Sequence, residues 1–367
     1  MKILIITHSL RYNYGGILQN YALQQVLKNM GHTVITLKLR RKLSFYLYAK
    51  NLIKYLLLKL GGFDRIKPLS EADLNLICCN TDKFIDANIT MSPSMDLIDK
   101  NWVKKQNIDA IIVGSDQVLH PASYKKIEEI YLNFISHVKK IIYAGSFGSE
   151  KWHYSEQQTL NCSKLLCDFD GISCRENSGV IFFKDKFYKS AKLVLDPTLL
   201  LDKEIYLKLI PHDKYTFGVV SYILDLTEEK EYIIKYIQEK LNLPGVKAGN
   251  PKMDSPIFQP QERITEGVES WLMKMSKADF IVTDSYHGTC FAILFKKNFI
   301  VIANRRRGLD RFVTLLSRCS LENRLIYDIA DISDDLINMN INYDDVDKLL
   351  EPYKKESIAF LDFILNN

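Results

Sequence analysis

The sequence predicts an α/β protein of two Rossmann-like, doubly wound domains that face a cleft. Two observations lead to this fold class. Short β-branched runs alternate with helical stretches along almost the whole chain, which is the order of β-α-β units in a parallel sheet. The length of 367 residues also exceeds what one small core needs and suits about two domains.

The first half of the chain opens as a β-α-β unit. Residues 3–6 are a predicted strand, residues 18–30 a helix closed by Gly31, and residues 32–39 a second strand. Further strand-like runs follow, each before a polar turn, at residues 109–114, 140–146, 170–173 and 191–196. This repeated order predicts a mostly parallel sheet in a first domain over residues 1–205.

A shorter series of the same kind predicts a second domain over residues 206–340. It comprises strand-like runs at 215–224 and 298–304, a helix at 228–241 and a strand–helix unit at 281–295. The charged stretch with Pro211 between the two series is the expected linker. A last helical stretch, residues 341–367, is expected to pack back on the first domain.

The composition is that of a soluble globular protein, with 47% hydrophobic and 25% charged residues. Seven cysteines are scattered without a Cys-x-x-Cys pair, which indicates reduced thiols and no zinc site. The apolar N-terminus has no cleavage-site pattern, so we expect no signal peptide and a cytoplasmic protein.

The net charge of +5 is unevenly distributed, because ten Lys and Arg residues and no acid precede Asp64. Residues 40–60 mix leucines and tyrosines with Lys50, Lys54 and Lys59, which argues against a transmembrane span. Two alternatives remain: a basic amphipathic helix on the inner leaflet of the plasma membrane, or a helix that packs its apolar face on the sheet. Nucleic-acid binding is disfavoured, because no recognition motif accompanies the basic stretch.

Polar turns at the predicted strand ends supply the candidate site residues. Ligands of open α/β sheets bind outside the carboxyl ends of the strands. These turns contribute Asn13, Asp116, Ser146, Arg175, Glu176 and His287. Each has a plainer explanation on its own, as a packed histidine, a turn-capping aspartate or a surface ion pair. Their joint occurrence at strand ends indicates a site.

Seven segments also carry a family resemblance: "NYGGILQNYALQQVLKNMGH", "VGSDQVLHP", "YAGSFG", "SCREN", "VLDPTLLL", "DSYHGTCFAILF" and "NRRRGLDRF". In this order, across about residues 3–315, they resemble the polysaccharide pyruvyl transferase family. The resemblance implies a GT-B-like enzyme of exopolysaccharide or capsule biosynthesis. Such an enzyme moves pyruvate from phosphoenolpyruvate, its co-substrate, onto two hydroxyls of a sugar as a ketal. It implies no cofactor and no metal.

The resemblance and this chemistry together assign roles. His287 matches a family histidine that contacts the donor, and it is the expected acid or phosphate ligand. Asp116 is the expected base or acceptor-hydroxyl ligand. The expected donor-binding residues are Arg175, Ser285, Tyr286, Gly288 and Arg307. The expected acceptor-binding residues are Asn13, Tyr14, Gly15, Gly16, Ser115, Gln117 and Ser146.

One departure from the family concerns charge. Family members often have an arginine two residues before the histidine, where this chain has Ser285. The basic run of Arg305, Arg306, Arg307 and Arg311 either supplies the missing cation or is only a solvated face. Two other functions remain open: a nucleotide-sugar-dependent glycosyltransferase of the same architecture, and a catalytically silent glycan-binding protein. The acceptor can be free, nucleotide-linked or lipid-linked.

Overall fold

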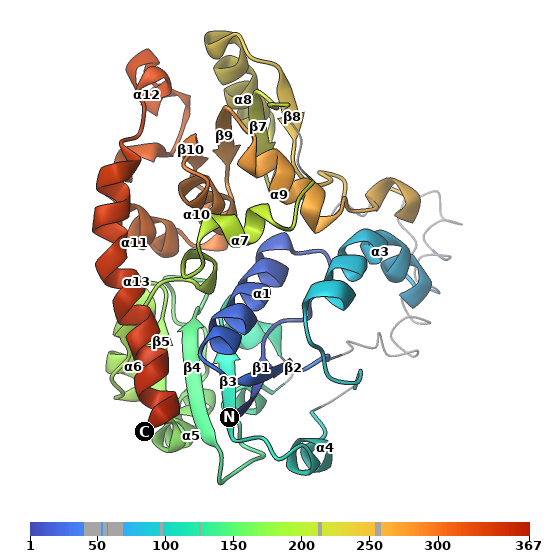
Figure 1. The fold of residues 1–367 in the computed structure, drawn as a ribbon, viewed down its shortest axis with the longest axis vertical. Coiled ribbons are helices and arrows are strands. Elements are labelled where there is room, and N and C mark those ends of the chain that lie inside the picture. Colours follow the sequence, from blue (N-terminus) through green and yellow to red (C-terminus); the bar gives the residue numbers. More distant parts are fainter. Residues whose placement is uncertain are drawn as a thin grey trace.

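The structure is a computed structural model that describes residues 1–39, 53, 57, 69–95, 98–124, 126–211, 215–253 and 258–367. Two parallel sheets, each flanked by helices, lie at opposite ends of the molecule (Figure 1). The predicted fold class is confirmed.

The first sheet has six strands in the order β2-β1-β3-β4-β5-β6. Its strands are β1 (Lys2–Ile6), β2 (Thr33–Thr36), β3 (Ala110–Gly114), β4 (Lys139–Gly145), β5 (Gly171–Cys174) and β6 (Lys192–Leu193). Its helices are α1 (Tyr14–Asn29), α3 (Glu71–Asn88), α4 (Lys100–Lys105), α5 (Glu156–Leu165) and α6 (Asn177–Phe187). Because the strand order reverses between β1 and β3, a ligand crevice is expected at their carboxyl ends.

The second sheet has five strands in the order β11-β10-β9-β7-β8. They are β7 (Val219–Tyr222), β8 (Gly245–Lys247), β9 (Phe280–Thr283), β10 (Asn298–Ile302) and β11 (Leu325–Ile326). Helix α7 (Lys203–Leu207) leads into this half, which also contains α8 (Glu228–Leu241), α9 (Val268–Ser276), α10 (Tyr286–Leu294), α11 (Asp310–Arg318) and α12 (Asp334–Asn338). Its strand order reverses between β7 and β9, so the corresponding crevice lies there.

The strands are apolar because they are buried on both faces. In β3, for example, all five residues are buried, as is typical of parallel sheets covered by helices. One cluster of buried apolar residues continues from the first sheet through α1 and α10 to the second sheet, with Trp271 fully buried in it. This shared core fixes the two halves against each other.

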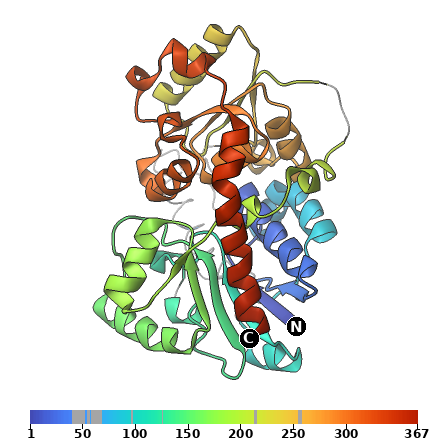
Figure 2. The same cartoon turned by 60° about the vertical axis from the view of Figure 1, so that its left-hand side comes forward.

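The C-terminal helix α13 (Tyr343–Asn366) runs along both halves of the molecule (Figure 2). The hydroxyl of Ser357 accepts a hydrogen bond from the backbone N–H of Leu195 at 2.9 Å. Lys139 at the start of β4 donates to the carbonyl of Ile364 at 2.8 Å. These contacts attach α13 to the first sheet.

The basic stretch over residues 40–60, with Lys50, Lys54 and Lys59, lies outside the described residues except for Ile53 and Leu57. Within the described ranges, no helix is both long enough and apolar enough to span a bilayer.

Candidate active site between the two domains

Helix α1 begins at the candidate site. Asn13 caps it, because its side-chain oxygen accepts a hydrogen bond from the N–H of Gly16 at 3.2 Å. The sequence predicted a helix that starts at residue 18, with Gly15 and Gly16 in the preceding turn. That boundary was wrong, because the Asn13 cap lets the helix begin at Tyr14 and include both glycines.

Gly15 lies directly against His287 of the other domain. His287 is in the first turn of α10, whose N-cap is Ser285. A side chain at Gly15 would come under 3.0 Å from three atoms of the His287 ring. The N-terminal ends of α1 and α10 therefore meet across the domain interface, and only glycine allows this approach.

The turn after β3 holds Ser115 and Asp116 in a left-handed backbone conformation, with φ of 23° and 67°. Residues other than glycine rarely occupy this region. The turn is fixed by a hydrogen bond from the N–H of Ser146 to the carbonyl of Asp116 at 3.0 Å. The Asp116 carboxylate in turn accepts from the Asn13 amide at 3.4 Å. Strained backbone of this kind clusters at functional sites.

Arg175 is the centre of a buried charge cluster. It donates from Nη1 to Asp196 at 2.6 Å and from Nη2 to Asp116 at 3.2 Å. Its Nε lies 3.9 Å from a carboxylate oxygen of Glu176. The guanidinium also covers the ring of Tyr286, 4.6 Å from the ring centroid. Three carboxylates therefore surround one buried cation.

Asp196 is a site residue that the sequence analysis missed. Its Oδ1 accepts from the N–H of Thr198 at 3.0 Å, and its Oδ2 accepts from the Ser115 hydroxyl at 3.0 Å. The same Oδ2 lies 3.6 Å from Nε2 of His287. Asp196 thus connects the histidine of the second domain to the first. Its sequence signal is an aspartate at the end of a strand-like run, directly before Pro197.

The cluster shifts the pKa values of its members. Burial raises the pKa of the Asp116 carboxyl, but Arg175 and His287 outweigh burial and bring it to about 2. Burial also raises the pKa of the Asp196 carboxyl, but His287 and Arg175 outweigh burial and hold this pKa well below the usual range. For Arg175 itself, burial lowers the pKa, and the two aspartates raise it overall. Burial raises the pKa of Glu176, so this carboxyl takes up a proton most easily.

A second polar cluster braces the loops at the carboxyl ends of β7 and β9. Asp284, fully buried, accepts from the N–H groups of Leu224 and Asp225 at 2.6 and 3.1 Å. Lys230 donates to the same carboxylate at 2.6 Å. Asn304 donates to Asp225 and Asp284 at 2.6 and 3.0 Å. This network fixes the loop that precedes α10.

Arg307 belongs to this second cluster, because its Nε and Nη2 donate to Asp225 at 2.6 and 3.1 Å. Arg311 extends instead toward the cluster around Arg175. Its side chain is buried, and its guanidinium lies 5.7 Å from the centroid of the Tyr286 ring. Arg307 is therefore paired with a carboxylate, whereas Arg311 packs beside an aromatic ring.

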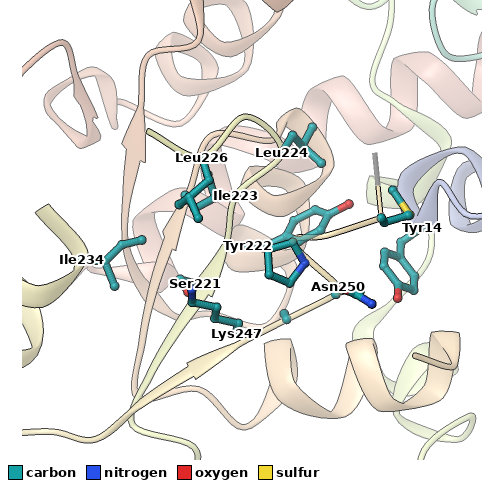
Figure 3. Close-up of a pocket in the computed structure, with 13 residues that line it drawn as sticks. Tyr14, Ser221, Tyr222, Ile223, Leu224, Leu226, Ile234, Lys247 and Asn250 are labelled. Carbon is teal, nitrogen blue, oxygen red and sulfur yellow. The ribbon is translucent and has the colours of Figure 1, made fainter. Parts of the chain in front are cut away.

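A pocket adjoins the charge cluster at the carboxyl ends of β7 and β8 (Figure 3). Tyr14 and Tyr222 border it, with ring centroids 6.1 Å apart and an edge-on arrangement. Because Tyr14 precedes Gly15, the pocket lies next to the contact between Gly15 and His287. Its remaining wall includes the apolar Ile223, Leu224, Leu226 and Ile234 and the polar Lys247 and Asn250.

Most of the predicted site residues come together between the two domains. The charge cluster and its immediate surroundings contain Asn13, Gly15, Ser115, Asp116, Gln117, Ser146, Arg175, Tyr286 and His287. Gly16 and Ser285 take part in the N-terminal caps of α1 and α10. Tyr14 lines the pocket, and Gly288 lies against Tyr222 in the pocket wall. Arg307, an expected donor-binding residue, is paired with Asp225 outside this cluster. Across the part of the chain that the structure describes, no group of three or more His, Cys, Asp or Glu side chains is arranged to hold a metal ion.

Comparisons with known proteins show the family and the fold of this chain. A family model described as polysaccharide pyruvyl transferase matches residues 13–306. No curated protein matches the chain in sequence. The structure is similar to UDP-N-acetylglucosamine 2-epimerase from Rickettsia bellii, with a TM-score of 0.52, 8% identity and coverage of 99% of this chain and 97% of that one. It is also similar to S. aureus MnaA in a structure with UDP, with a TM-score of 0.52, 13% identity and coverage of 100% and 97%. At these identities the likeness concerns the fold alone, which is the predicted GT-B-like fold.

Proposed function

Because this chain belongs to the polysaccharide pyruvyl transferase family, we propose that it transfers pyruvate from phosphoenolpyruvate to a sugar as a ketal. The acceptor is a sugar of a surface polysaccharide precursor that offers two hydroxyls. The observation that carries the proposal is the convergence of His287, Arg175, Asp116 and Asp196 where the crevices of the two sheets meet.

The reaction needs three kinds of group. A proton adds to the methylene carbon of phosphoenolpyruvate, and a sugar hydroxyl attacks the adjacent carbon and loses its own proton. Phosphate then leaves, and the second hydroxyl closes the ring with loss of a second proton. An acid beside the donor, cations for the donor anion and an acceptor for hydroxyl protons are therefore required.

His287 is the proposed donor contact and proton source. Its Nε2 faces the ionised Asp196 at 3.6 Å, and a carboxylate beside an imidazole fixes the orientation of the ring. Glycine at position 15 lets the ring lie directly against the first turn of α1. Asp196 therefore acts as a positioning residue for His287.

Asp116 is the proposed acceptor-hydroxyl ligand. Its pKa of about 2 keeps it ionised at neutral pH, where it accepts hydrogen bonds but takes up protons poorly. Holding and orienting the attacking hydroxyl suits this property better than acting as a strong base. Arg175 keeps Asp116 and Asp196 ionised and in position.

We also propose that the protein binds a cytoplasmic membrane surface that carries a lipid-linked acceptor. Ten basic and no acidic residues precede Asp64. The side chains of Ile53 and Leu57 within this stretch are 58% and 65% exposed. Apolar side chains together with basic charge favour reversible binding to an anionic leaflet.

The test is incubation of the protein with phosphoenolpyruvate and a panel of free, nucleotide-linked and lipid-linked glycans. We expect phosphate release together with a mass gain on one acceptor. Phosphoenolpyruvate should also raise the melting temperature, because a ligand that binds the native state stabilises it. Stabilisation by a nucleotide sugar and not by phosphoenolpyruvate would refute the proposal in favour of a glycosyltransferase.

A further inference from the structure

We infer that Arg311 is an anion-binding residue of the donor subsite and takes the carboxylate or the phosphate of the donor. This inference rests on the proposed function, which requires cations for a small dianionic or trianionic donor. It assigns that task to one arginine of the basic run, which was not among the expected donor-binding residues.

Arg311 is buried without a carboxylate partner. Only 7% of its surface is exposed. Among the described residues, no Asp or Glu oxygen lies within 4.0 Å of its guanidinium, and its Nε has no hydrogen-bond partner. Its other contacts are the amide oxygen of Gln117, 3.3 Å from Nη2, and the ring faces of Tyr286 and Phe312.

A buried charge is normally paired, because leaving it unpaired costs several kcal/mol. The pKa of Arg311 reflects this cost, since burial and the nearby Arg175 lower it to about 10. At neutral pH the side chain still carries its charge. Glu176 and Asp116 offset this cost only in part, and an anion bound beside Arg311 would supply a counter-charge in direct contact with it.

The two arginines that the sequence analysis placed in the donor site, Arg175 and Arg307, are already paired with carboxylates. Arg175 is enclosed by Asp196, Asp116 and Glu176, so its fork is used within the protein. Arg307 is held by both oxygens of Asp225. A donor anion would have to displace a carboxylate from either of them, whereas at Arg311 it displaces none.

Arg311 lines a small pocket between the domains. The pocket is also lined by Ser146, Gly148 and Glu176 of the first domain and by Arg307 and Gly308 of the second. Two side chains that line this pocket have a buried polar atom without a hydrogen-bond partner: Nε of Arg311 and Oε2 of Glu176. Buried polar atoms are normally satisfied, so such a group indicates a missing polar ligand.

The acids near this pocket are committed elsewhere. Glu150 accepts from the N–H groups of Leu309 and Asp310 at 2.7 Å each, which caps α11 from the first domain. Asp310 in return accepts from the N–H of Ser178 at 2.6 Å, at the start of α6. These reciprocal caps hold the first turn of α11, and Arg311 with it, against the first domain. Glu176, with its raised pKa, is the acid that can be neutral beside a bound anion.

The experiment compares Arg311→Ala, Arg311→Lys and Arg311→Met with the wild-type protein. The matched control is Arg306→Ala, an exposed arginine of the same basic run. Isothermal titration measures the Kd of phosphoenolpyruvate, inorganic phosphate and pyruvate. Since a hydrogen bond to a charged group is worth about 1.5–3 kcal/mol, Arg311→Ala should weaken phosphoenolpyruvate binding roughly 10- to 150-fold. The control should stay within about twofold of wild type, and lysine should restore part of the loss.

Inorganic phosphate and pyruvate distinguish which donor group Arg311 binds. Loss of phosphate binding in Arg311→Ala assigns the phosphate, and loss of pyruvate binding assigns the carboxylate. Melting temperature without ligand gives an independent readout. Arg311→Met should melt at or above the wild-type temperature, because it removes an unpaired buried charge, and phosphoenolpyruvate should no longer raise it.

The outcomes separate this inference from the proposed function. Unchanged phosphoenolpyruvate affinity in Arg311→Ala, with normal binding by wild type, overturns the inference and leaves the proposed function intact. Binding of phosphate or pyruvate that depends on Arg311, without transfer from phosphoenolpyruvate to any acceptor, supports the anion site and counts against the proposed function. A wild-type protein that binds none of the three ligands overturns both. Marked destabilisation of Arg311→Met would show that Arg311 is structural.

Discussion

The substitution Gly15→Ala tests directly how closely the two domains approach each other at His287. The added methyl group would lie under 3.0 Å from three ring atoms of His287, so the ring or the domain interface must move. The required shift is about 1 Å, and a misplacement of that size can cost on the order of 100-fold in rate. Helix α1 itself should tolerate alanine, because alanine favours a helix over glycine by about 1 kcal/mol.

We therefore expect Gly15→Ala to fold and to lose about 100-fold in kcat/KM for ketal formation. The assay follows phosphate release and the mass of the acceptor, with circular dichroism and melting temperature as checks on the fold. Gly267→Ala is the matched control, because a methyl group there meets only the flexible carboxylate of Glu269, at 3.1 Å. Wild-type turnover in Gly15→Ala would refute the reasoning that His287 must approach the first domain at this point.

Three further predictions test separate parts of the site. His287→Ala should lose about 10²–10⁴-fold in turnover with an intact fold, and near-normal activity would make His287 a packing residue. The pKa of Asp116 falls from 3.8 to about 2 in the folded state, so its contribution to stability, about 2 kcal/mol, is present above pH 4 and lost as the pH falls through 2. Asp116→Asn should make urea unfolding less sensitive to pH in that range, and an unchanged slope would contradict the ion pair. Changing Lys50, Lys54 and Lys59 to Glu should abolish co-sedimentation with anionic liposomes, and equal recovery of both proteins in the supernatant would leave no membrane role.

The fold was predictable from the sequence because the strands are buried on both faces. A residue run such as Ala110–Gly114 must be apolar throughout in a parallel sheet, and its pattern differs from that of the intervening helices. Helix boundaries were less predictable. A polar cap such as Asn13 can extend a helix over residues of poor helix propensity, and Gly15 and Gly16 are held in α1 in this way.

The proximity of the candidate site residues was also predictable, because parallel strands bring their carboxyl-end turns to one edge. This rule brought Asp116, Arg175 and His287 to attention before their contacts were known. The charge partners were not predictable. Asp196 pairs with Arg175 across 21 positions and approaches His287 across the domain interface. Only the relative placement of the domains creates that contact.

Contacts were equally unpredictable for residues close together in sequence, as the basic run over residues 305–311 shows. Arg307 and Arg311 are equally plausible cations in sequence, yet one lies in a 3-10 turn at Arg305–Arg307 and the other in the first turn of α11. The turn directs Arg307 to Asp225 of its own domain, while the Glu150 cap directs the start of α11 toward the first domain. Formal charge therefore gives a poor guide to which arginine is free to bind a ligand.

The enclosure of Arg175 by three carboxylates changes the role expected of it. The sequence suggested a fork that grips the donor, but a cation with this many internal partners would lose them on binding an anion. In the structure Arg175 contacts two depressed-pKa carboxylates, of which Asp116 is directed to Asn13 and Asp196 to His287. A buried ion cluster of this kind adds little net stability by itself, because desolvation offsets the attraction. Under the proposed function its benefit is preorganisation, because Asp116 and His287 would already be in position before any substrate arrives.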